Sequence, residues 1–294
     1  MIMTEINEAF FKKYYPRRSK DSYKNLNGKV FIVAGSKDMP GAAVLASRAA
    51  YAAGAGFVTL AGVSDIRPAL INAVPEALIL DIKSSGGYLG AEALAQIKEY
   101  LKNNPQDVIL TGCGLSKGAL ITEELLKSAA LPAVIDADSL NFISSRGASV
   151  LKDIPCILTP HVGEMKRLLG DIPFDAENAA LKISELSGGV CLLKGPATQI
   201  CFNGSKNINS SGNEGLAKAG SGDVLAGIIA AVWAKTLKAG GAANPRERGF
   251  LAASLGVYLH GACVDCAAGK VSKESITASM LIETLPYVLK KLLD

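Results

Sequence analysis

The sequence predicts an α/β fold, a three-layer α/β/α sandwich around a mostly parallel central sheet. Two patterns predict it. Short runs of Val, Ile and Leu recur along the 294 residues without alternating with polar residues, as strands covered on both faces require. Each run ends abruptly in glycine or polar residues and a helical pattern follows, which is the order of βα units in a parallel sheet.

The predicted strands follow this pattern from the first third of the chain onward. With the residues that end them, the runs are Val30–Ser36, Phe57–Leu60, Ala77–Leu80, Val108–Gly112, Ala133–Asp138, Cys156–His161 and Val190–Gly195. A further run, Gln199–Gly204, ends in Asn-Gly, which predicts a hairpin-like turn at the sheet edge.

Helical patterns lie between and after these runs. Pro40 suits the first turn of a helix that continues through Ala53 and stops at Gly54. The others are Ala91–Lys102, Lys117–Ser128, Glu164–Leu169, Asp175–Leu186, Asp223–Lys238, Arg246–Ala268 and Ile276–Leu293. No linker or repeat divides the chain, so we expect an N-terminal arm or helix over residues 1–27 and one domain over 28–294.

Composition excludes several classes of protein. A chain that is 49% hydrophobic and 20% charged is not disordered. Only two histidines occur, which excludes a histidine-rich metal site, and we expect no metal held by the protein alone. The net charge of +4 is mild, and the basic residues near the start are interleaved with aromatics, which favours a solvated terminal helix over a nucleic-acid arm.

The cysteines and the apolar runs indicate a compartment. Most of the six cysteines lie in apolar runs, and the lone C-x-x-C at Cys263 and Cys266 has no second pair, so reduced thiols fit better than zinc. The longest apolar run, Val224–Ala234, is shorter than the ~20 residues of a membrane span. No signal peptide is recognisable, so we expect a cytoplasmic protein with no membrane partner.

The carboxyl ends of the predicted strands indicate where a ligand would bind, because ligands of open parallel sheets lie beyond those ends. Glycine and polar residues gather there: Gly35-Ser36, Gly112-Cys113-Gly114, Asp136, Asp138, Thr159-Pro160-His161 and Lys194-Gly195.

The most informative stretch is Gly220-Ser221-Gly222-Asp223 before an apolar helix. A helix N-terminus behind a flexible glycine loop favours an anion, because unpaired N–H groups and the helix dipole both attract negative charge. Asp223 would lie beside that anion and accept a proton from an attacking hydroxyl. The alternative is that Asp223 only caps the helix; the glycines directly before it favour the functional interpretation.

Four other polar residues allow two interpretations each. Lys194 at a strand end is a point charge suited to phosphate, or a surface lysine. His161 after Pro160 contacts a ligand or packs in its loop. Asp136 and Asp138 serve magnesium or cap the next helix, with neither favoured. His260, on an apolar helix, is expected to be a core residue.

Taken together, these motifs resemble the ADP- or ATP-dependent NAD(P)H-hydrate dehydratases, a carbohydrate kinase-related branch of the ribokinase-like superfamily. The likeness extends from about residue 28 to the C-terminus. The matching pieces, in the family's order, are Gly35-Ser36, Pro40-Gly-Ala-Ala43, Ala53-Gly-Ala-Gly56, Gly112-Cys-Gly-Leu115, Asp136-Ala-Asp-Ser-Leu-Asn141, Thr159-Pro-His-Val-Gly-Glu164, Lys194-Gly195 with Thr198, Asn213-x-Gly-x-Ala, Gly220-Ser-Gly-Asp-Val-Leu-Ala-Gly227 and Leu255-Gly-Val-Tyr-Leu-His-Gly261.

The resemblance implies a hydro-lyase that restores NADH and NADPH from their S hydrates (NADHX and NADPHX). The nucleotide, with ADP favoured over ATP but the choice left open, phosphorylates the ring hydroxyl with Mg²⁺ present, and phosphate then leaves. It implies that Ala42, Gly114, His161 and Asp223 contact the hydrate, with Asp223 as the catalytic base. It further implies that Lys194, Gly195, Pro196, Ala197, Thr198 and Gly222 bind the nucleotide, and that Gly220, Ser221 and Gly222 form an anion hole.

The chain departs from the family pattern at a few positions. The loop 112–116 reads Gly-Cys-Gly-Leu-Ser where the family usually has Gly-Pro-Gly-Leu-Gly, and Met280 replaces a usual aspartate. The resemblance also implies a homo-oligomer, such as a tetramer, and a separate NAD(P)HX epimerase as functional partner.

Two other functions compete with this interpretation. A small-molecule kinase of the same fold would release the phosphorylated alcohol, and a nucleotide-binding regulator would keep the fold without catalysis. Thr159-Pro-His161 argues against the kinase, and the intact Gly-Ser-Gly-Asp against the regulator. A Rossmann dehydrogenase is excluded because no strand leads into Gly-x-Gly-x-x-Gly with a following acidic residue.

Overall fold

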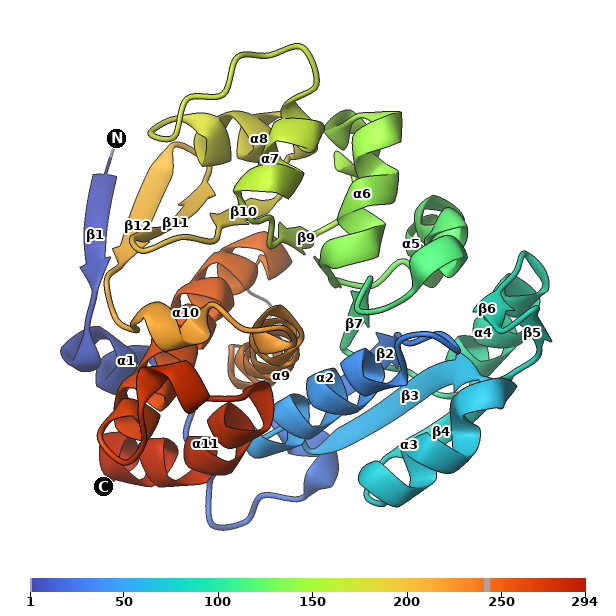
Figure 1. Ribbon diagram of the computed structural model, residues 1–294, viewed down its shortest axis with the longest axis horizontal. Helices are drawn as coiled ribbons and strands as arrows, with labels where there is room; N and C mark the ends of the chain where they lie inside the picture. Colours follow the sequence, from blue (N-terminus) through green and yellow to red (C-terminus); the bar gives the residue numbers. More distant parts are fainter. Residues whose placement is uncertain (1, 241–243) are drawn as a thin grey trace.

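A ten-stranded sheet crosses the molecule in the computed structural model, which describes residues 2–240 and 244–294. Figure 1 shows it running between two groups of helices. In spatial order the strands are β1 (Ile2–Ile6), β12 (Ser205–Asn209), β11 (Thr198–Phe202), β10 (Val190–Leu193), β9 (Cys156–Leu158), β8 (Ala133–Ile135), β7 (Val108–Thr111), β2 (Lys29–Val33), β3 (Phe57–Val63) and β4 (Leu78–Ile82). Only β11 pairs antiparallel with its neighbours in this sheet, so the predicted mostly parallel sheet is confirmed.

The hairpin between β11 and β12 has the turn that its sequence predicts. Asn203 and Gly204 connect the strands with φ of 47° and 74°, the positive values that a two-residue hairpin turn requires. Its predicted place at the sheet edge is wrong, because β1 pairs in parallel with β12 and forms the edge itself. The strand β1 was not predicted from the sequence, and the division into an N-terminal arm and one domain stays a prediction.

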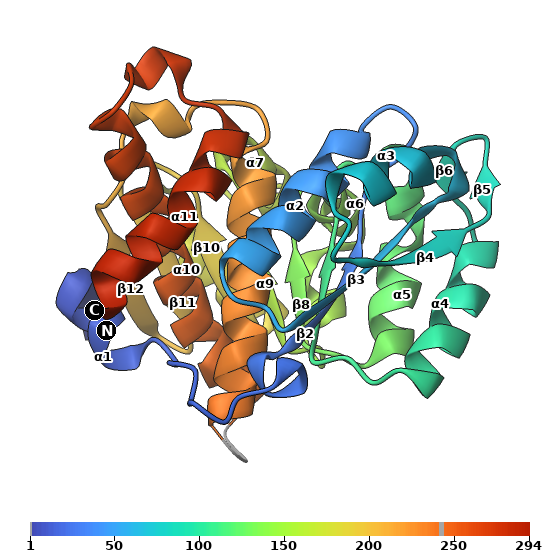
Figure 2. The ribbon, with the colours of Figure 1, turned by 90° about the horizontal axis from the view of Figure 1, so that it is seen from below.

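Two helical layers cover the sheet. One contains α2 (Pro40–Ala52), α3 (Arg67–Ala73), α9 (Ser221–Ala239), α10 (Pro245–Ala268) and α11 (Ala278–Leu293), and the other α4 (Glu92–Asn103), α5 (Thr122–Ala129), α6 (Ala137–Arg146), α7 (Val162–Leu169) and α8 (Ala179–Ser187). Figure 2 shows α2, α9 and α11 in front of the strands, with α5 and α6 behind them. The short α1 (Glu8–Tyr14) packs on α10 and α11. The strands β5 (Ser84–Ser85) and β6 (Tyr88–Leu89), of two residues each, pair with one another in a separate small sheet.

Two helices begin a full turn or more later than the sequence predicts, whereas α4 and α11 begin only one and two residues later. The predicted Lys117–Ser128 helix is a 3₁₀ segment over Ser116–Ile121 followed by α5. The predicted Asp175–Leu186 helix begins at Ala179, because the Asp175 carboxylate accepts bonds from the Glu177 backbone and the Asn178 side chain and holds a turn instead.

The helices α9 and α10 form the centre of their layer. From Val224 to Thr236 every residue of α9 is buried. The part from Val224 to Ala234 is apolar on every face, as a buried helix requires, and Lys235 and Thr236 are buried with it. Within the described residues, α10 is the one helix whose length and hydropathy would suffice to cross a membrane, and 67% of its apolar window is buried inside the structure. That burial is typical of a core helix.

Gly227 permits α2 and α9 to cross closely, because a Cβ added there would lie 2.2 Å from the Ala46 carbonyl oxygen. We expect Gly227→Ala to lower the free energy of unfolding by about 1–3 kcal/mol, although alanine is the better helix former. Gly41→Ala is the matched control, since no atom lies within 4 Å of an added Cβ in its helix. Urea unfolding measures both; equal stability of the two variants would contradict the packing argument.

Candidate active site

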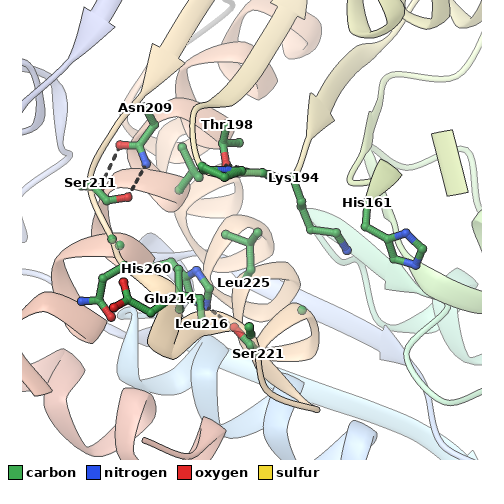
Figure 3. Close-up of a pocket in the computed structure, with 18 of the residues that line it drawn as sticks. His161, Lys194, Thr198, Asn209, Ser211, Glu214, Leu216, Ser221, Leu225 and His260 are labelled. Atoms are coloured by element: carbon green, nitrogen blue, oxygen red, sulfur yellow. Dashed lines mark hydrogen bonds between the residues drawn. The ribbon is translucent and has the colours of Figure 1, made fainter. Parts of the chain in front are cut away.

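A cavity of about 810 Å³ lies beyond the carboxyl ends of β10 and β12, where the N-terminus of α9 meets α10. This volume is within the range of small-molecule sites. Figure 3 shows side chains from both layers directed into it. Its lining comprises His161, Lys194, Gly195, Pro196, Thr198, Asn209, Ser211, Gly212, Asn213, Glu214, Leu216, Ala217, Lys218, Ser221, Gly222, Leu225, Val257, His260 and Gly261.

The predicted glycine loop opens α9 at the wall of this cavity. Gly220 has φ of +84° and occupies the N-cap position, and no side chain caps the helix. Other residues rarely adopt this φ, so the conformation favours glycine; a Cβ there would also lie 2.5 Å from Leu45 Cδ1, the end of a side chain that can move. The positive end of the helix dipole therefore faces the cavity without a capping side chain, which favours a bound anion.

Asp223 follows in the first turn of α9 and is half-buried. Burial, and next the negative charge of Asp136, raise its pKa to about 6. The Cys113 thiol and the Lys194 ammonium act in the opposite direction, and Asp138 adds to the increase. A carboxylate with this pKa is ionised at neutral pH and is a stronger base than an ordinary aspartate.

Lys194 is held in a buried network instead of projecting freely. Its Nζ lies 2.9 Å from Asp136 Oδ1 and 3.8 Å from Glu164 Oε2, and Thr159 donates a hydrogen bond of 2.8 Å to the same Asp136 oxygen. Burial alone would lower the pKa of Lys194, but the two carboxylates outweigh it and raise the pKa. The ammonium therefore stays charged. A phosphate that binds Lys194 would share it with the carboxylates of Asp136 and Glu164.

His161 holds the start of α7 and lines the cavity at the same time. Its Nδ1 accepts hydrogen bonds from the backbone N–H groups of Gly163 and Glu164 at 2.9 and 3.2 Å, and the backbone N–H of His161 donates to Glu164 Oε2 at 2.8 Å. With Nδ1 acting as acceptor, the neutral ring carries its proton on Nε2. The ring has a structural role in its loop. Its Nε2 lies 3.6 Å from Glu164 Oε1, too far for a strong hydrogen bond, so it can donate to a ligand.

The two aspartates after β8 have protein partners. Asp136 is bound by Lys194 and Thr159, and Asp138 accepts the Ser116 N–H at 2.7 Å. Asp136 occupies the N-cap position of α6 and Asp138 its first turn, but neither side chain makes a capping hydrogen bond. The capping alternative is therefore wrong for both, and their service to magnesium stays a prediction.

The predicted site residues form two neighbouring groups. His161, Lys194, Gly195, Pro196, Thr198, Ser221 and Gly222 line the cavity, whereas Ala42, Gly114, Ala197, Gly220 and Asp223 are absent from its lining. A Cβ on Gly114 would meet Ala42 at 2.7 Å, so these two residues touch. Cys113, next to Gly114, lies within 4.8 Å of Asp223 by its sulfur. Asp223 thus lies between the cavity and the region of Ala42 and Gly114.

His260 is buried as expected, but it also lines the cavity, a position that was not predicted from the sequence. It is 4% exposed, and its Nε2 lies 3.3 Å from Ser221 Oγ in the glycine loop. Burial lowers the pKa of His260 to about 4, so the ring is neutral at pH 7. The sequence feature that could have indicated this position is the spacing of Val257, His260 and Gly261, which places them on the face of α10 that lines the cavity.

Comparison with known proteins finds relatives that cover nearly the whole chain. A family model described as NAD(P)H-hydrate dehydratase matches residues 30–287. The bifunctional NAD(P)H-hydrate repair enzyme of Moorella thermoacetica is 38% identical over 98% of this chain and 54% of its own length. The ADP-dependent (S)-NAD(P)H-hydrate dehydratase of Neisseria meningitidis is 35% identical over 92% of this chain and 86% of its own. The chain thus spans about half the length of the bifunctional relatives.

A solved structure shares the fold across the chain. The ADP/ATP-dependent NAD(P)H-hydrate dehydratase from Bacillus subtilis, co-crystallised with ATP and Mg²⁺, superposes with a TM-score of 0.78 at 28% identity, covering 98% of each chain.

Proposed function

Because this chain belongs to the NAD(P)H-hydrate dehydratase family, we propose that it dehydrates the S epimers of NADHX and NADPHX to restore NADH and NADPH. ADP is the proposed phosphoryl donor, with ATP less favoured; the Neisseria relative is named as ADP-dependent, and the Bacillus relative accepts both by its name. The observation that carries the proposal is Asp223, placed in the first turn of α9 beside an uncapped glycine loop and a nucleotide-sized cavity.

The chemistry requires two steps. The ring hydroxyl attacks the terminal phosphorus of ADP, its proton passes to Asp223, and the bond to AMP breaks. The ring nitrogen lone pair then expels phosphate from the ring carbon, and loss of a proton from the adjacent carbon restores the dihydronicotinamide. Phosphorylation helps because hydroxide is a poor leaving group and phosphate a good one. The protein contributes orientation and charge stabilisation.

The two groups of site residues are proposed to hold the two substrates. The cavity, with Lys194, Gly195, Pro196, Thr198 and Gly222 in its lining, would take the nucleotide. Ala197 lies in the same loop between β10 and β11. Ala42 and Gly114 would contact the hydrate on the other side of Asp223, and His161 would contact it from the lining of the cavity. The N–H groups of Gly220, Ser221 and Gly222 would form the hole for the transferring phosphate.

Mg²⁺ is proposed to enter with the nucleotide. Hard oxygen donors suit this ion, which usually keeps several waters and binds substrate phosphates plus one or two carboxylates. The carboxylates beside the cavity fit that chemistry, and the buried thiol of Cys113 does not. When bound, the ion would neutralise charge on the donor phosphates.

The biological setting is also a proposal. We propose an NAD(P)HX epimerase as functional partner. The bifunctional relatives are about twice as long as this chain, which leaves room for a second activity. A dehydratase that acts on one epimer needs an enzyme that converts the other epimer into it. We also propose a homo-oligomer, such as a tetramer, and a cytoplasmic location.

Recovery of NADH absorbance tests the function. Purified protein, hydrated NADH, Mg²⁺ and either ADP or ATP are mixed, and the near-ultraviolet absorbance is followed. We expect recovery with ADP exceeding that with ATP, with one AMP formed per NADH. No recovery with either nucleotide would refute the dehydratase, and accumulation of a stable phosphorylated hydrate would indicate the kinase alternative.

A further inference from the structure

We infer that His260 is a positioning residue for the anion hole: its Nε2–H donates to Ser221 Oγ and so directs the serine hydroxyl hydrogen to the phosphate that is transferred. The inference rests on the proposed function for the identity of the anion, the terminal phosphate of ADP. It goes beyond the proposed anion hole, which uses the backbone N–H of Ser221.

The two side chains meet at the wall of the cavity. His260 projects from α10, Ser221 is the first residue of α9, and both line the cavity. Ser221 Oγ and His260 Nε2 lie 3.3 Å apart, and Figure 3 shows the two side chains next to one another. Their residues are only 6% and 4% exposed, so bulk water has little access to the bond between them.

The hydroxyl is the donor of Ser221 that is available to an anion. The backbone N–H of Ser221 already donates to the Lys218 carbonyl at 3.3 Å. Within the part of the chain that the structure describes, the hydroxyl has one hydrogen-bond partner, the His260 ring. A phosphate held at the first turn of α9 would lie beside this hydroxyl, because Ser221 forms that turn and faces the cavity.

The chemistry of the three groups sets the direction of each bond. An ionised phosphate oxygen only accepts hydrogen bonds, and a serine hydroxyl has one hydrogen and two lone pairs. Ser221 can therefore bind the phosphate only by giving it that hydrogen, and the serine oxygen then accepts from the ring. Burial lowers the pKa of His260 to about 4, so the ring at pH 7 carries one proton, which this arrangement places on Nε2.

The chain of bonds from the ring to the phosphate explains why a buried histidine would matter at this position. In a region of low dielectric constant, each hydrogen bond of a chain polarises the next one and strengthens it. The donation by His260 thus makes the Ser221 hydroxyl a better donor and fixes its orientation before the nucleotide binds. A side chain without an N–H donor would leave the hydroxyl free to rotate.

Affinity for ADP tests this arrangement. His260→Leu removes the ring donor, and we expect ADP affinity to fall about 3- to 10-fold, the effect of one neutral hydrogen bond. Ser221→Ala removes the bond to the charged phosphate and should lower ADP affinity about 10- to 100-fold. Because His260 acts through Ser221, the double variant should bind ADP within about 2-fold of Ser221→Ala alone. Calorimetric titration in the presence of Mg²⁺ measures each affinity.

AMP is the matched ligand, because it keeps the adenosine and lacks the phosphate that is transferred. We expect AMP to bind all three variants within about 2-fold of the wild-type protein. His260→Gln keeps an N–H donor and should recover ADP affinity to within about 2-fold of wild type. Ser254→Ala removes a buried hydroxyl of the same helix, away from the described lining of the cavity, and should change neither affinity.

Three results would each overturn the inference. A double variant that binds ADP clearly more weakly than Ser221→Ala would mean that His260 acts on the phosphate without Ser221. Equal losses for ADP and AMP in His260→Leu, with no recovery in His260→Gln, would mean that the ring only packs the wall of the cavity. Ser221→Ala with wild-type ADP affinity would show that the hydroxyl does not bind the phosphate.

The titrations also separate this inference from the proposed function, because they do not need the reaction. Variants that behave as expected, in a protein that does not restore NADH, would refute the dehydratase and leave the role of His260 standing. Recovery of NADH together with any of the three contrary results would refute the role of His260 alone. Absence of ADP binding by the wild-type protein would overturn both.

Discussion

Asp223→Asn is expected to lower turnover by about 10³-fold or more while ADP still binds. The amide keeps the shape of the carboxylate but cannot accept the hydroxyl proton, and a positioned general base contributes about 10²–10⁴-fold. Single-turnover NADH recovery measures the chemistry, and calorimetry measures ADP affinity. Asp171→Asn, at an exposed aspartate after α7, is the matched control and should change neither.

The same substitution should stabilise the fold above pH 6. The pKa of Asp223 is raised in the folded protein from its usual 3.8 to about 6, so the native state holds the proton more tightly than the unfolded chain. This cost of ionisation is absent below pH 4, grows between pH 4 and 6, and is complete above pH 6. Asp223→Asn avoids it, and we expect a gain of about 1–3 kcal/mol at pH 8 and little difference at pH 4. Turnover equal to wild type would exclude Asp223 as the base, and equal stability at pH 8 would contradict the burial argument.

Lys194→Met is expected to weaken ADP binding by about 10- to 100-fold, the range of a charge-assisted hydrogen bond. The methionine keeps the length of the side chain and removes the ammonium that neutralises Asp136 and Glu164. Two carboxylates then face the cavity uncompensated, so a nucleotide anion would meet repulsion as well as a missing donor. Calorimetric titration with ADP and Mg²⁺ measures the loss.

Two further variants separate the charge of Lys194 from its shape, one at Lys194 itself and one control elsewhere on the surface. Lys194→Arg keeps the cation and should retain most of the affinity, whereas Lys182→Met, at an exposed lysine of α8, should retain all of it. ADP binding by Lys194→Met with wild-type affinity would mean that Lys194 only balances its two carboxylates and that the N-terminus of α9 alone binds the phosphates.

The parallel sheet was predictable from the sequence because its central strands carry a local signal. Val108–Thr111 is apolar apart from its last residue and is buried throughout. The edge strand β1 lacks such a signal: Ile2–Ile6 is a short run with Thr4 and Glu5 among its apolar residues, and it is a strand because β12 lies beside it. Pairing with a segment 200 residues away cannot be inferred from either segment alone.

The site shows the same division between local and distant signals. The glycine loop and Asp223 are adjacent in the chain, so an anion site with a base beside it could be predicted from Gly-Ser-Gly-Asp alone. The bond between Lys194 and Asp136 joins residues 58 positions apart, and that between Ser221 and His260 joins residues 39 apart. Each of these residues was noticed in the sequence for its type, but its hydrogen-bond partner became visible only in the fold.

The path of the ring oxygen tests the proposed chemistry most directly. Hydrated NADH is prepared in H₂¹⁸O so that the ring hydroxyl carries the label, and repair then proceeds in ordinary water with ADP and Mg²⁺. Attack of that hydroxyl on the donor phosphorus predicts one ¹⁸O atom in each phosphate released, detected by mass spectrometry. Unlabelled phosphate, with the label lost to water, would show that the ring is dehydrated without being phosphorylated and would contradict the account.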